Sequence, residues 1–226
     1  MENIDFSLKK GETLGIIGAT GAGKTTLIRL LLRLYDTDRG SVRLDGVNVD
    51  SMAMEDLHRR FGVVFQKDFL YADTLEENIA FGRKLSRASV YEASEHAQAE
   101  SFIASLTDGM NHRLTPKGTN LSGGQKQRVL LSRALAGKPE ILILDDSSSA
   151  LDYKTDAELR KALFESYAET TTVMIAQRVS SIQHADAIMM LEEGKIIGYG
   201  THEELMKSCP KYHDMYKNQS GGDQIA

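Results

Sequence analysis

The sequence is poor in cysteine, and it has neither a long apolar run nor an excess of basic residues. The single cysteine, Cys209, cannot form an internal disulfide, which fits a reducing cytosol. No apolar run approaches the ~20 residues that a membrane-spanning helix needs, and the first ten residues are too polar for a signal peptide. We therefore expect a soluble chain, which other segments must hold at a membrane if it works there.

The net charge and the length limit which partners and how many domains we expect. The 226 residues carry 27 basic and 32 acidic side chains, for a net charge of −5, whereas nucleic-acid-binding proteins usually show a basic excess or stripe. We therefore expect no nucleic-acid partner. A hydrophobic content of 41% over this length is enough for one sizeable core, and the sequence has no internal repeat. We expect one domain over residues 1–226.

Apolar patterning predicts an α/β fold. Asp-Gly and Glu-Gly pairs at residues 45–46 and 193–194 predict hairpin turns. The expected strands cover residues 4–8, 14–17, 61–65, 141–144 and 172–176, with hairpins at 41–49 and 187–199. The expected helices cover residues 24–34, 87–106, 123–136 and 155–168. We interpret residues 67–138 as a helical insertion into a core formed by residues 1–66 and 139–226.

A glycine-rich loop follows the apolar strand at 14–17 and opens the next helix. It reads G-x-x-x-x-G-K-T from Gly18 to Thr25, in the strand–loop–helix context that a phosphate-binding loop requires. Its glycines let backbone N–H groups curl around phosphate oxygens, and the helix N-terminus adds partial positive charge. The expected ATP-binding residues are Gly18, Ala19, Thr20, Gly21, Ala22, Gly23, Lys24, Thr25 and Thr26.

A second half of this nucleotide site comes from the apolar strand at 141–144, which ends in Asp145. Lys24 is expected to reach the β- and γ-phosphates, while the Thr25 hydroxyl and the Asp145 carboxylate hold Mg²⁺. The alternative is a chance glycine-rich turn. The apolar strand that ends in Asp145 argues against it. The loop alone predicts nucleotide binding, but it does not indicate the class of NTPase.

The class of NTPase is indicated by a second motif, the segment Leu121-Ser122-Gly123-Gly124-Gln125. Ser122 can cap the helix that follows, and the two glycines leave the backbone bare for a γ-phosphate at that helix's N-terminus. The plainer interpretation, a helix-capping loop, holds at the same time.

Together, the phosphate loop (the P-loop), the acidic strand end and LSGGQ resemble the nucleotide-binding domain of ABC exporters, over essentially the whole chain. LSGGQ matches the family's signature motif, called the signature below. Gln66 matches the family's Q-loop, a contact to Mg²⁺ and water. The stretches at 74–79 and 200–205, TLEENI and GTHEEL, are similar to exporter-type segments. The D-loop matches Ser149, Ala150, Leu151 and Asp152.

This resemblance implies a P-loop NTPase (RecA-like) core with a helical subdomain and an antiparallel β subdomain. It implies an ATPase coupled to transmembrane export, with ATP and Mg²⁺ as cofactors and Thr25, Gln66 and Asp145 as metal ligands. The implied partners are a transmembrane domain and a second nucleotide-binding domain, joined head to tail so that each ATP meets one P-loop and the opposite signature. The implied location is the cytoplasmic face of the plasma membrane.

Two departures from the family fall among the expected catalytic residues Asp146, Gln177 and Gln66. Asp146 stands where the family usually has the glutamate that polarises water, and a ~1 Å misplacement can cost ~10²-fold in rate. Gln177 stands at the switch histidine and cannot take up a proton. Both changes in one site predict a degenerate ATP site in an asymmetric heterodimer. The alternative is a slow but working homodimer.

Further departures lie outside the catalytic residues. The family's adenine-stacking aromatic lies upstream of the first strand, so we expect this chain to start inside the domain. The loop before the signature reads LTPKG at 114–118 and lacks the family's acidic residue. Phe69, Leu70 and Tyr71 follow Gln66, and they either line a groove for a coupling helix or cap the helical insertion.

Two other functional classes remain open at this point. One is a soluble ABC ATPase that acts on ribosomes or DNA, for which a second ATPase domain, a coiled-coil insertion or basic arms are expected. The other is a regulatory half that binds ATP without turning it over. This second class merges with the exporter interpretation if the ATP site is degenerate.

Overall fold

The computed structural model describes residues 1–146 and 150–220, and these divide into two compact units. One unit holds residues 1–60 together with the segment from 171 onward, and the other holds residues 61–170. Each unit joins strands to helices, so the chain is an α/β protein, as the sequence predicts. Within the described residues, every helix is too short or too polar to cross a bilayer.

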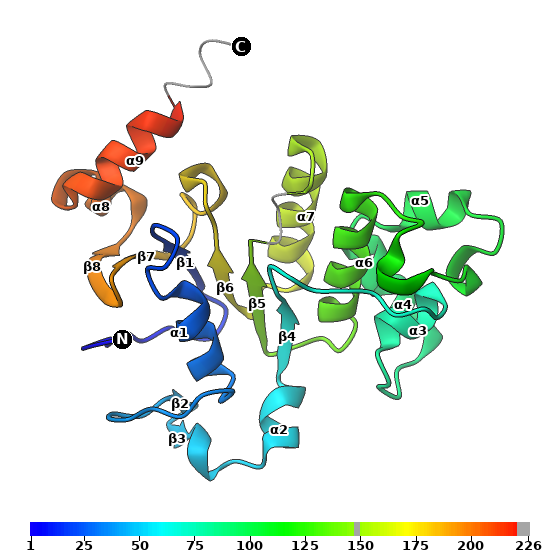
Figure 1. The fold of residues 1–226 in the computed structure, drawn as a ribbon, viewed down its shortest axis with the longest axis horizontal. Coiled ribbons are helices and arrows are strands. Elements are labelled where there is room, and N and C mark those ends of the chain that lie inside the picture. Colours follow the sequence, from blue (N-terminus) through cyan, green and yellow to red (C-terminus); the bar gives the residue numbers. More distant parts are fainter. Residues whose placement is uncertain (147–149, 221–226) are drawn as a thin grey trace. The chain divides into compact units, whose positions relative to one another are not determined.

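The first unit is built around strand β1 (Thr13–Ile17), which is almost wholly buried. β1 pairs in parallel with β6 (Thr171–Ile175) on one side and with β7 (Ala187–Glu192) on the other. β7 pairs antiparallel with β8 (Lys195–Gly200) (Figure 1). The other elements are helices α1 (Lys24–Leu31), α2 (Met54–Arg59), α8 (His202–Ser208) and α9 (Pro210–Ser220), the hairpin of β2 (Arg43–Leu44) and β3 (Val47–Asn48), and 3₁₀ turns at Val49–Ser51 and Val179–Ser181.

The second unit pairs β4 (Phe61–Val64) in parallel with β5 (Ile141–Asp145) and surrounds them with helices. The strands lie close to the long helix α6, because a Cβ at Gly62 would come within 2.3 Å of the Ala134 carbonyl oxygen. The helices are α3 (Leu75–Ala80), α4 (Arg87–His96), α5 (Glu100–Ser105), α6 (Gly123–Leu135) and α7 (Tyr153–Ser166), with 3₁₀ turns at Gly109–Asn111 and Pro116–Gly118.

The prediction of a strand at residues 4–8 is wrong. Ile4, Phe6 and Leu8 are half-buried and their neighbours are exposed, so the alternation is real. The segment has no ladder partner among the described residues. It is instead fastened at its ends, where the Glu2 amide donates to the Gly194 carbonyl and the Lys9 amide to the Glu12 carboxylate.

The expected helix over residues 87–106 is two helices. Gln98 takes a left-handed backbone conformation with φ at +58°, which breaks the helix between α4 and α5. The Ala99 amide donates to the Ser94 carbonyl, which closes the end of α4. The other predicted helices and strands are present, with their ends shifted by a few residues.

Candidate functional site

The glycine-rich loop lies where β1 ends and α1 begins, in the first unit (Figure 1). At Gly18 a Cβ would stand 2.2 Å from the Leu191 carbonyl oxygen, so only glycine fits against β7. Gly23 caps α1 with φ at +104°, a conformation that other residues rarely adopt. The Gly194 amide donates to the Ala22 carbonyl at 3.0 Å, which ties the loop to the turn between β7 and β8. The loop is therefore a preformed cradle.

Lys24 turns back over this loop. Its Nζ donates to the carbonyl oxygens of Gly18 at 2.6 Å and of Ala19 at 2.9 Å. The side chains of Thr25 and Thr26 are exposed in the first turn of α1, and that turn contains no acidic residue. Backbone N–H groups, a cation and hydroxyls thus gather at one helix N-terminus, an arrangement suited to phosphate oxygens.

The expected acidic residues lie at the end of β5, in the second unit. Asp145 is the last residue of the strand and is only 4% exposed. Asp146 follows in a left-handed conformation with φ at +53° and accepts a hydrogen bond from Gln66 Nε2 at 3.3 Å. Gln66 lies two residues beyond the end of β4. Because β4 and β5 are parallel, the ends of both strands lie at the same edge of the sheet. The structure therefore brings Gln66 and Asp146 together.

The LSGGQ segment forms the N-terminus of α6. Leu121 is buried, while Ser122 caps the helix by accepting from the Gln125 amide at 3.2 Å. The Gln125 side chain accepts in return from the Ser122 amide at 2.9 Å, which completes a capping box. At Gly124 a Cβ would lie 3.2 Å from the Ala150 carbonyl oxygen, whereas at Gly123 it would meet none of the described atoms within 4 Å.

The expected D-loop is described only in part, since Ser149 lies outside the described residues. Asp152 caps α7 by accepting from the Thr155 amide at 2.9 Å and from its hydroxyl at 2.8 Å. These hydrogen bonds, the backbone one first, hold the pKa of the exposed Asp152 carboxyl below its usual range. Ala150 and Leu151 lie between this cap and β5.

The predicted site residues divide between the two units. The glycine-rich loop and Gln177 belong to the first unit, where Gln177 is exposed just beyond β6. Gln66, Asp145, Asp146 and the signature belong to the second. A joint site with Thr25, Gln66 and Asp145 as metal ligands stays a prediction.

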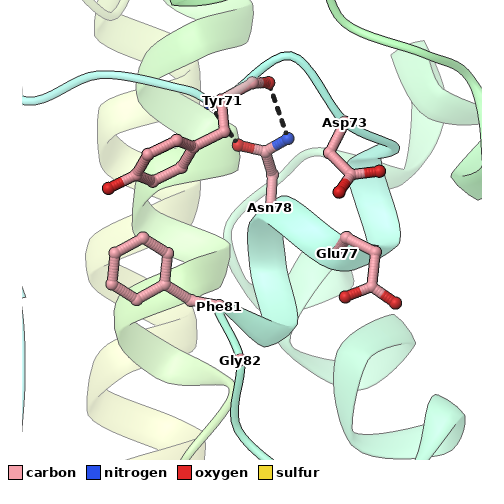
Figure 2. A pocket seen from close by; sticks show the side chains of 6 residues that line it. All are labelled: Tyr71, Asp73, Glu77, Asn78, Phe81 and Gly82. Carbon is pink, nitrogen blue, oxygen red and sulfur yellow. Dashed lines mark hydrogen bonds between the residues drawn. The ribbon is translucent and has the colours of Figure 1, made fainter.

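A feature that the sequence indicated only in part is a shallow pocket of about 260 Å³ beside α3. Figure 2 shows the rings of Tyr71 and Phe81 facing each other on one side, with the carboxylates of Asp73 and Glu77 on the other. The two ring centroids are 5.6 Å apart, and both rings are about half exposed. Asn78 braces the floor, because its Nδ2 donates to the Tyr71 carbonyl at 3.1 Å and its Oδ1 accepts from the Tyr71 amide at 2.8 Å.

Arg133 of the signature helix supports the same pocket from inside. Its guanidinium lies 4.4 Å from the centre of the Phe81 ring, and its Nε donates to the Asn78 carbonyl at 2.9 Å. Burial lowers the pKa of Arg133, and the neighbouring Asp68 partly offsets this effect. The signature helix and the pocket are thus one packed structure. Phe81 itself has φ at +52°, so a bulky residue is held in a conformation that costs about 1–2 kcal/mol.

Comparison with known proteins agrees with these features. A family model described as ABC transporter matches residues 1–149. An uncharacterized ABC transporter ATP-binding protein of Bacillus subtilis is 42% identical over 222 residues, which is 98% of this chain and 38% of that protein. An ATP-dependent lipid A-core flippase of Methylobacillus flagellatus is 39% identical over 219 residues, covering 96% of this chain and 38% of the flippase.

A solved structure, that of a bacterial Atm1-family ABC exporter with ATP bound, superposes with a TM-score of 0.92 at 36% identity. The match covers 95% of this chain and 38% of the exporter chain. The fold is therefore α/β with a P-loop NTPase core, as the resemblance implies. The chain spans well under half the length of the proteins it matches.

Proposed function

This chain belongs to the ABC transporter family, and we propose that it is the ATP-binding domain of an exporter that couples ATP to transport across a membrane. In this proposal it works at the cytoplasmic face of the plasma membrane and pairs head to tail with a second nucleotide-binding domain. It binds MgATP but turns it over slowly at its own site. Support comes from relatives whose names describe a flippase and exporters.

The observation that carries the proposal is a glycine that the chain's own packing does not need. Among the described residues, a Cβ at Gly123 would meet no atom within 4 Å, and Gly123 lies in the first turn of a capped helix. In the proposed function, the bare backbone leaves room for a group supplied from outside this chain. A γ-phosphate held by a second domain fits, because a helix N-terminus stabilises an anion.

The chain's own site is proposed to hold MgATP through two sets of groups. The loop of residues 18–26 and Lys24 bind the phosphates, and Thr25, Gln66 and Asp145 offer the hard oxygen donors that Mg²⁺ prefers. The bound ion would neutralise charge on the phosphates. Asp146 would polarise the attacking water, and Gln177 would hydrogen-bond the γ-phosphate.

Both of these groups are weak for their tasks. The Asp146 carboxylate is one methylene shorter than a glutamate and accepts a hydrogen bond from Gln66. Gln177 cannot take up a proton. Loss of a positioned base typically costs ~10²–10⁴-fold, so slow turnover is the expected result. The partner domain is then expected to carry a glutamate after its own acidic strand end and a switch histidine.

The transmembrane partner is proposed to dock at the pocket beside α3. Its aromatic wall, Tyr71 and Phe81, offers apolar contact area, with Phe69 half exposed nearby. Its opposite wall carries the carboxylates of Asp73 and Glu77. A short helix with an apolar side chain flanked by a lysine or arginine would complement both walls. The alternative of a soluble ABC ATPase on ribosomes or DNA has no such support.

The test compares two variants in the reconstituted full-length pair. Gly123→Asp should abolish most ATPase activity, because a carboxylate facing a γ-phosphate in a dry interface is strongly repelled. Its thermal stability should not fall, because an acidic residue in the first turn of a helix is favourable. Asp146→Asn should leave most of the activity intact, since the partner's site performs most of the turnover.

Gly123→Ala supplies a second comparison, because this variant adds no charge and improves helix propensity. It should also lower activity without destabilising the chain. If Asp146→Asn proves as damaging as Gly123→Asp, this chain is a catalytic half in its own right and the asymmetric assignment is wrong.

A further inference from the structure

The C-terminal helix α9 holds the segment that follows β6 through one side chain. Gln219 donates from Nε2 to the carbonyl oxygen of Gln177 at 2.8 Å. Its Oε1 accepts from the amide of Val179, also at 2.8 Å. The two hydrogen bonds are made to the backbone on either side of Arg178, in the pattern by which an adjacent strand would pair with it. Gln219 therefore acts as a clamp on the irregular segment 176–178, which carries Gln177.

The chemistry of the clamp requires glutamine. It needs one donor and one acceptor at the end of a side chain of this length, and a side-chain amide supplies both. Turning the amide over would set N–H against N–H and oxygen against oxygen, so its orientation is fixed by its two partners. A glutamate would keep the bond from Val179 but would face the Gln177 carbonyl without a proton to donate.

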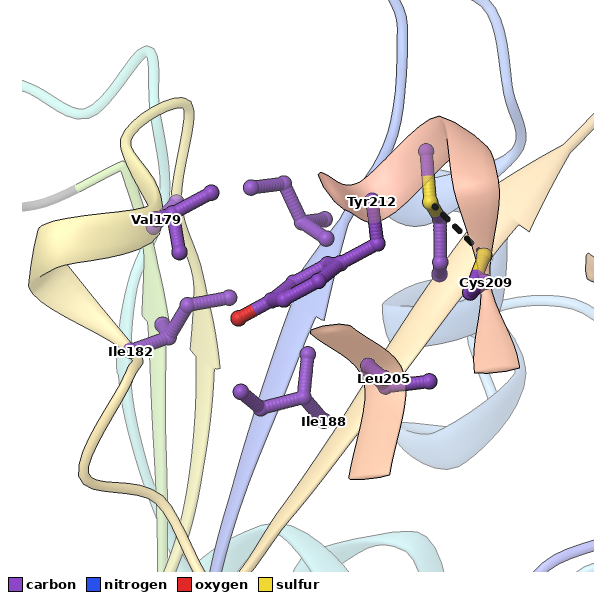
Figure 3. Packing of buried hydrophobic residues seen from close by; sticks show 9 residues of the cluster. Val179, Ile182, Ile188, Leu205, Cys209 and Tyr212 are labelled. Carbon is purple, nitrogen blue, oxygen red and sulfur yellow. Dashed lines mark hydrogen bonds between the residues drawn. The ribbon is translucent and has the colours of Figure 1, made fainter. Parts of the chain in front are cut away.

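The helix that carries Gln219 is firmly packed. Figure 3 shows the Tyr212 ring of α9 among Val179, Ile182, Ile188 and Leu205. Tyr212 and Val179 are completely buried, so α9 packs against the same 3₁₀ turn whose first amide Gln219 accepts from.

The exporter-like segment GTHEEL leads into this arrangement. Thr201 caps α8 in a capping box with Glu204. His202 Nδ1 shares a 2.8 Å hydrogen bond with the Tyr212 hydroxyl, which joins α8 to α9. The clamp therefore rests on two helices that are fixed to each other and to the core.

We propose that Gln219 is a positioning residue, which sets the backbone at Gln177 so that the exposed Gln177 side chain reaches the γ-phosphate of ATP. This inference rests on the proposed role of Gln177 in the chain's own ATP site. The direction of a side chain follows from its backbone. At Gln177 the described backbone lies outside any helix or strand, and the two hydrogen bonds from Gln219 hold it on either side of Arg178.

The first test measures the clamp without any chemistry. Amide hydrogen exchange at Val179 should accelerate roughly tenfold in Gln219→Ala, the effect of losing one hydrogen bond. Asn218→Ala is the matched control, because it removes a side-chain amide from the adjacent, exposed position of the same helix. It should leave Val179 exchange unchanged. Equal exchange in the two variants would overturn the inference.

The second test measures ATP hydrolysis at this chain's own site. Single-turnover hydrolysis is followed in the assembled transporter after the partner's own P-loop lysine has been replaced. Gln219→Ala and Gln219→Glu should each slow hydrolysis about tenfold, within the ~10²-fold of a 1 Å misplacement. ATP affinity should stay within about twofold, because the phosphate loop is untouched, and Asn218→Ala should match the unmodified chain.

A double-mutant cycle separates positioning from general destabilisation. In a Gln177→Ala background, Gln219→Ala should cause no further loss of rate, because the group that it positions is gone. An equal loss in both backgrounds would overturn the inference. If Gln177→Ala slows hydrolysis and Gln219→Ala does not, the inference alone is wrong. If Gln177→Ala has no effect, the proposed role of Gln177 fails and the inference fails with it.

Discussion

At the scale of single residues, Lys24 combines two tasks. Its ammonium donates to the carbonyls of Gly18 and Ala19 in the phosphate loop, and in the proposed function it also supplies positive charge to the phosphates of ATP. Lys24→Ala should therefore weaken ATP binding more than it changes hydrolysis. Hydrogen bonds to charged groups contribute about 1.5–3 kcal/mol, so the dissociation constant should rise about 10–100-fold. Calorimetry with MgATP measures this directly.

The matched control for Lys24 is Lys207→Ala, which removes an exposed lysine from α8. This variant should bind ATP like the unmodified chain. Equal affinity in the Lys24 and Lys207 variants would contradict the assignment of the phosphate loop.

The proposed catalytic roles of Asp146 and Gln177 predict a gain of function. Asp146→Glu together with Gln177→His should speed hydrolysis at the chain's own site, because a longer carboxylate and a titratable side chain are restored. Each single change should do less, since both groups act on one water and one phosphate and are not additive. The assay is single-turnover hydrolysis with the partner's own site disabled. No gain in the double variant would show that other residues silence this site.

Site residues differ in how well the sequence announces them. The glycine-rich loop and LSGGQ are visible because their function needs particular residues at fixed spacing. Gln219 has no such signature, because it binds backbone atoms of Gln177 and Val179, about 40 positions earlier in the chain. Backbone partners impose no residue type on their own positions, so only the structure reveals this pairing.

At the scale of elements, the contact between helices α8 and α9 includes the buried phenol of Tyr212, whose ionisation makes stability depend on alkaline pH. Burial, and secondarily the nearby Tyr216, raises the pKa of Tyr212 to about 12, above the ordinary value near 10. The folded state thus favours the protonated hydroxyl. The resulting stability is complete below about pH 10 and is lost as pH rises toward 12.

Tyr212→Phe tests this dependence. At neutral pH the variant should be less stable by about 1 kcal/mol, because the hydrogen bond with His202 is lost. Between pH 10 and 12 its free energy of unfolding should fall less steeply than that of the unmodified chain. Urea titrations at several pH values measure both effects. Parallel pH profiles for the two proteins would refute the assignment.

Elements were predicted well where local pattern and tertiary context agree. The hairpin turns at residues 45–46 and 193–194 are formed by the residues that such turns demand. The misreadings arose where context decided. Residues 4–8 have the alternation of a strand but no ladder partner in the described structure. Residues 87–106 have continuous helical character, and the break at Gln98 is a backbone conformation that glutamine does not signal.

At the scale of the whole molecule, the proposed asymmetry predicts the stoichiometry of a single turnover. A pair loaded with two ATP molecules should hydrolyse about half of the bound nucleotide quickly and the rest ~10²–10⁴-fold more slowly, because only one site has a well-positioned base. Rapid mixing followed by acid quench gives the amplitude of each phase. A single fast phase that consumes all bound ATP would be incompatible with a degenerate site.

The pairing of β1 has a consequence for the order in which the protein assembles during translation. Thr13 of β1 lies beside Thr172, and Leu14 lies beside Ala187. At about 5–20 residues per second, the ribosome reaches these partners on the order of 10–30 s after making β1. Meanwhile residues 61–170, whose strands pair with each other, have emerged and can collapse on their own. The phosphate loop packs against β7 and the turn after it, so the loop gains these supports only when residues 187–194 have left the exit tunnel.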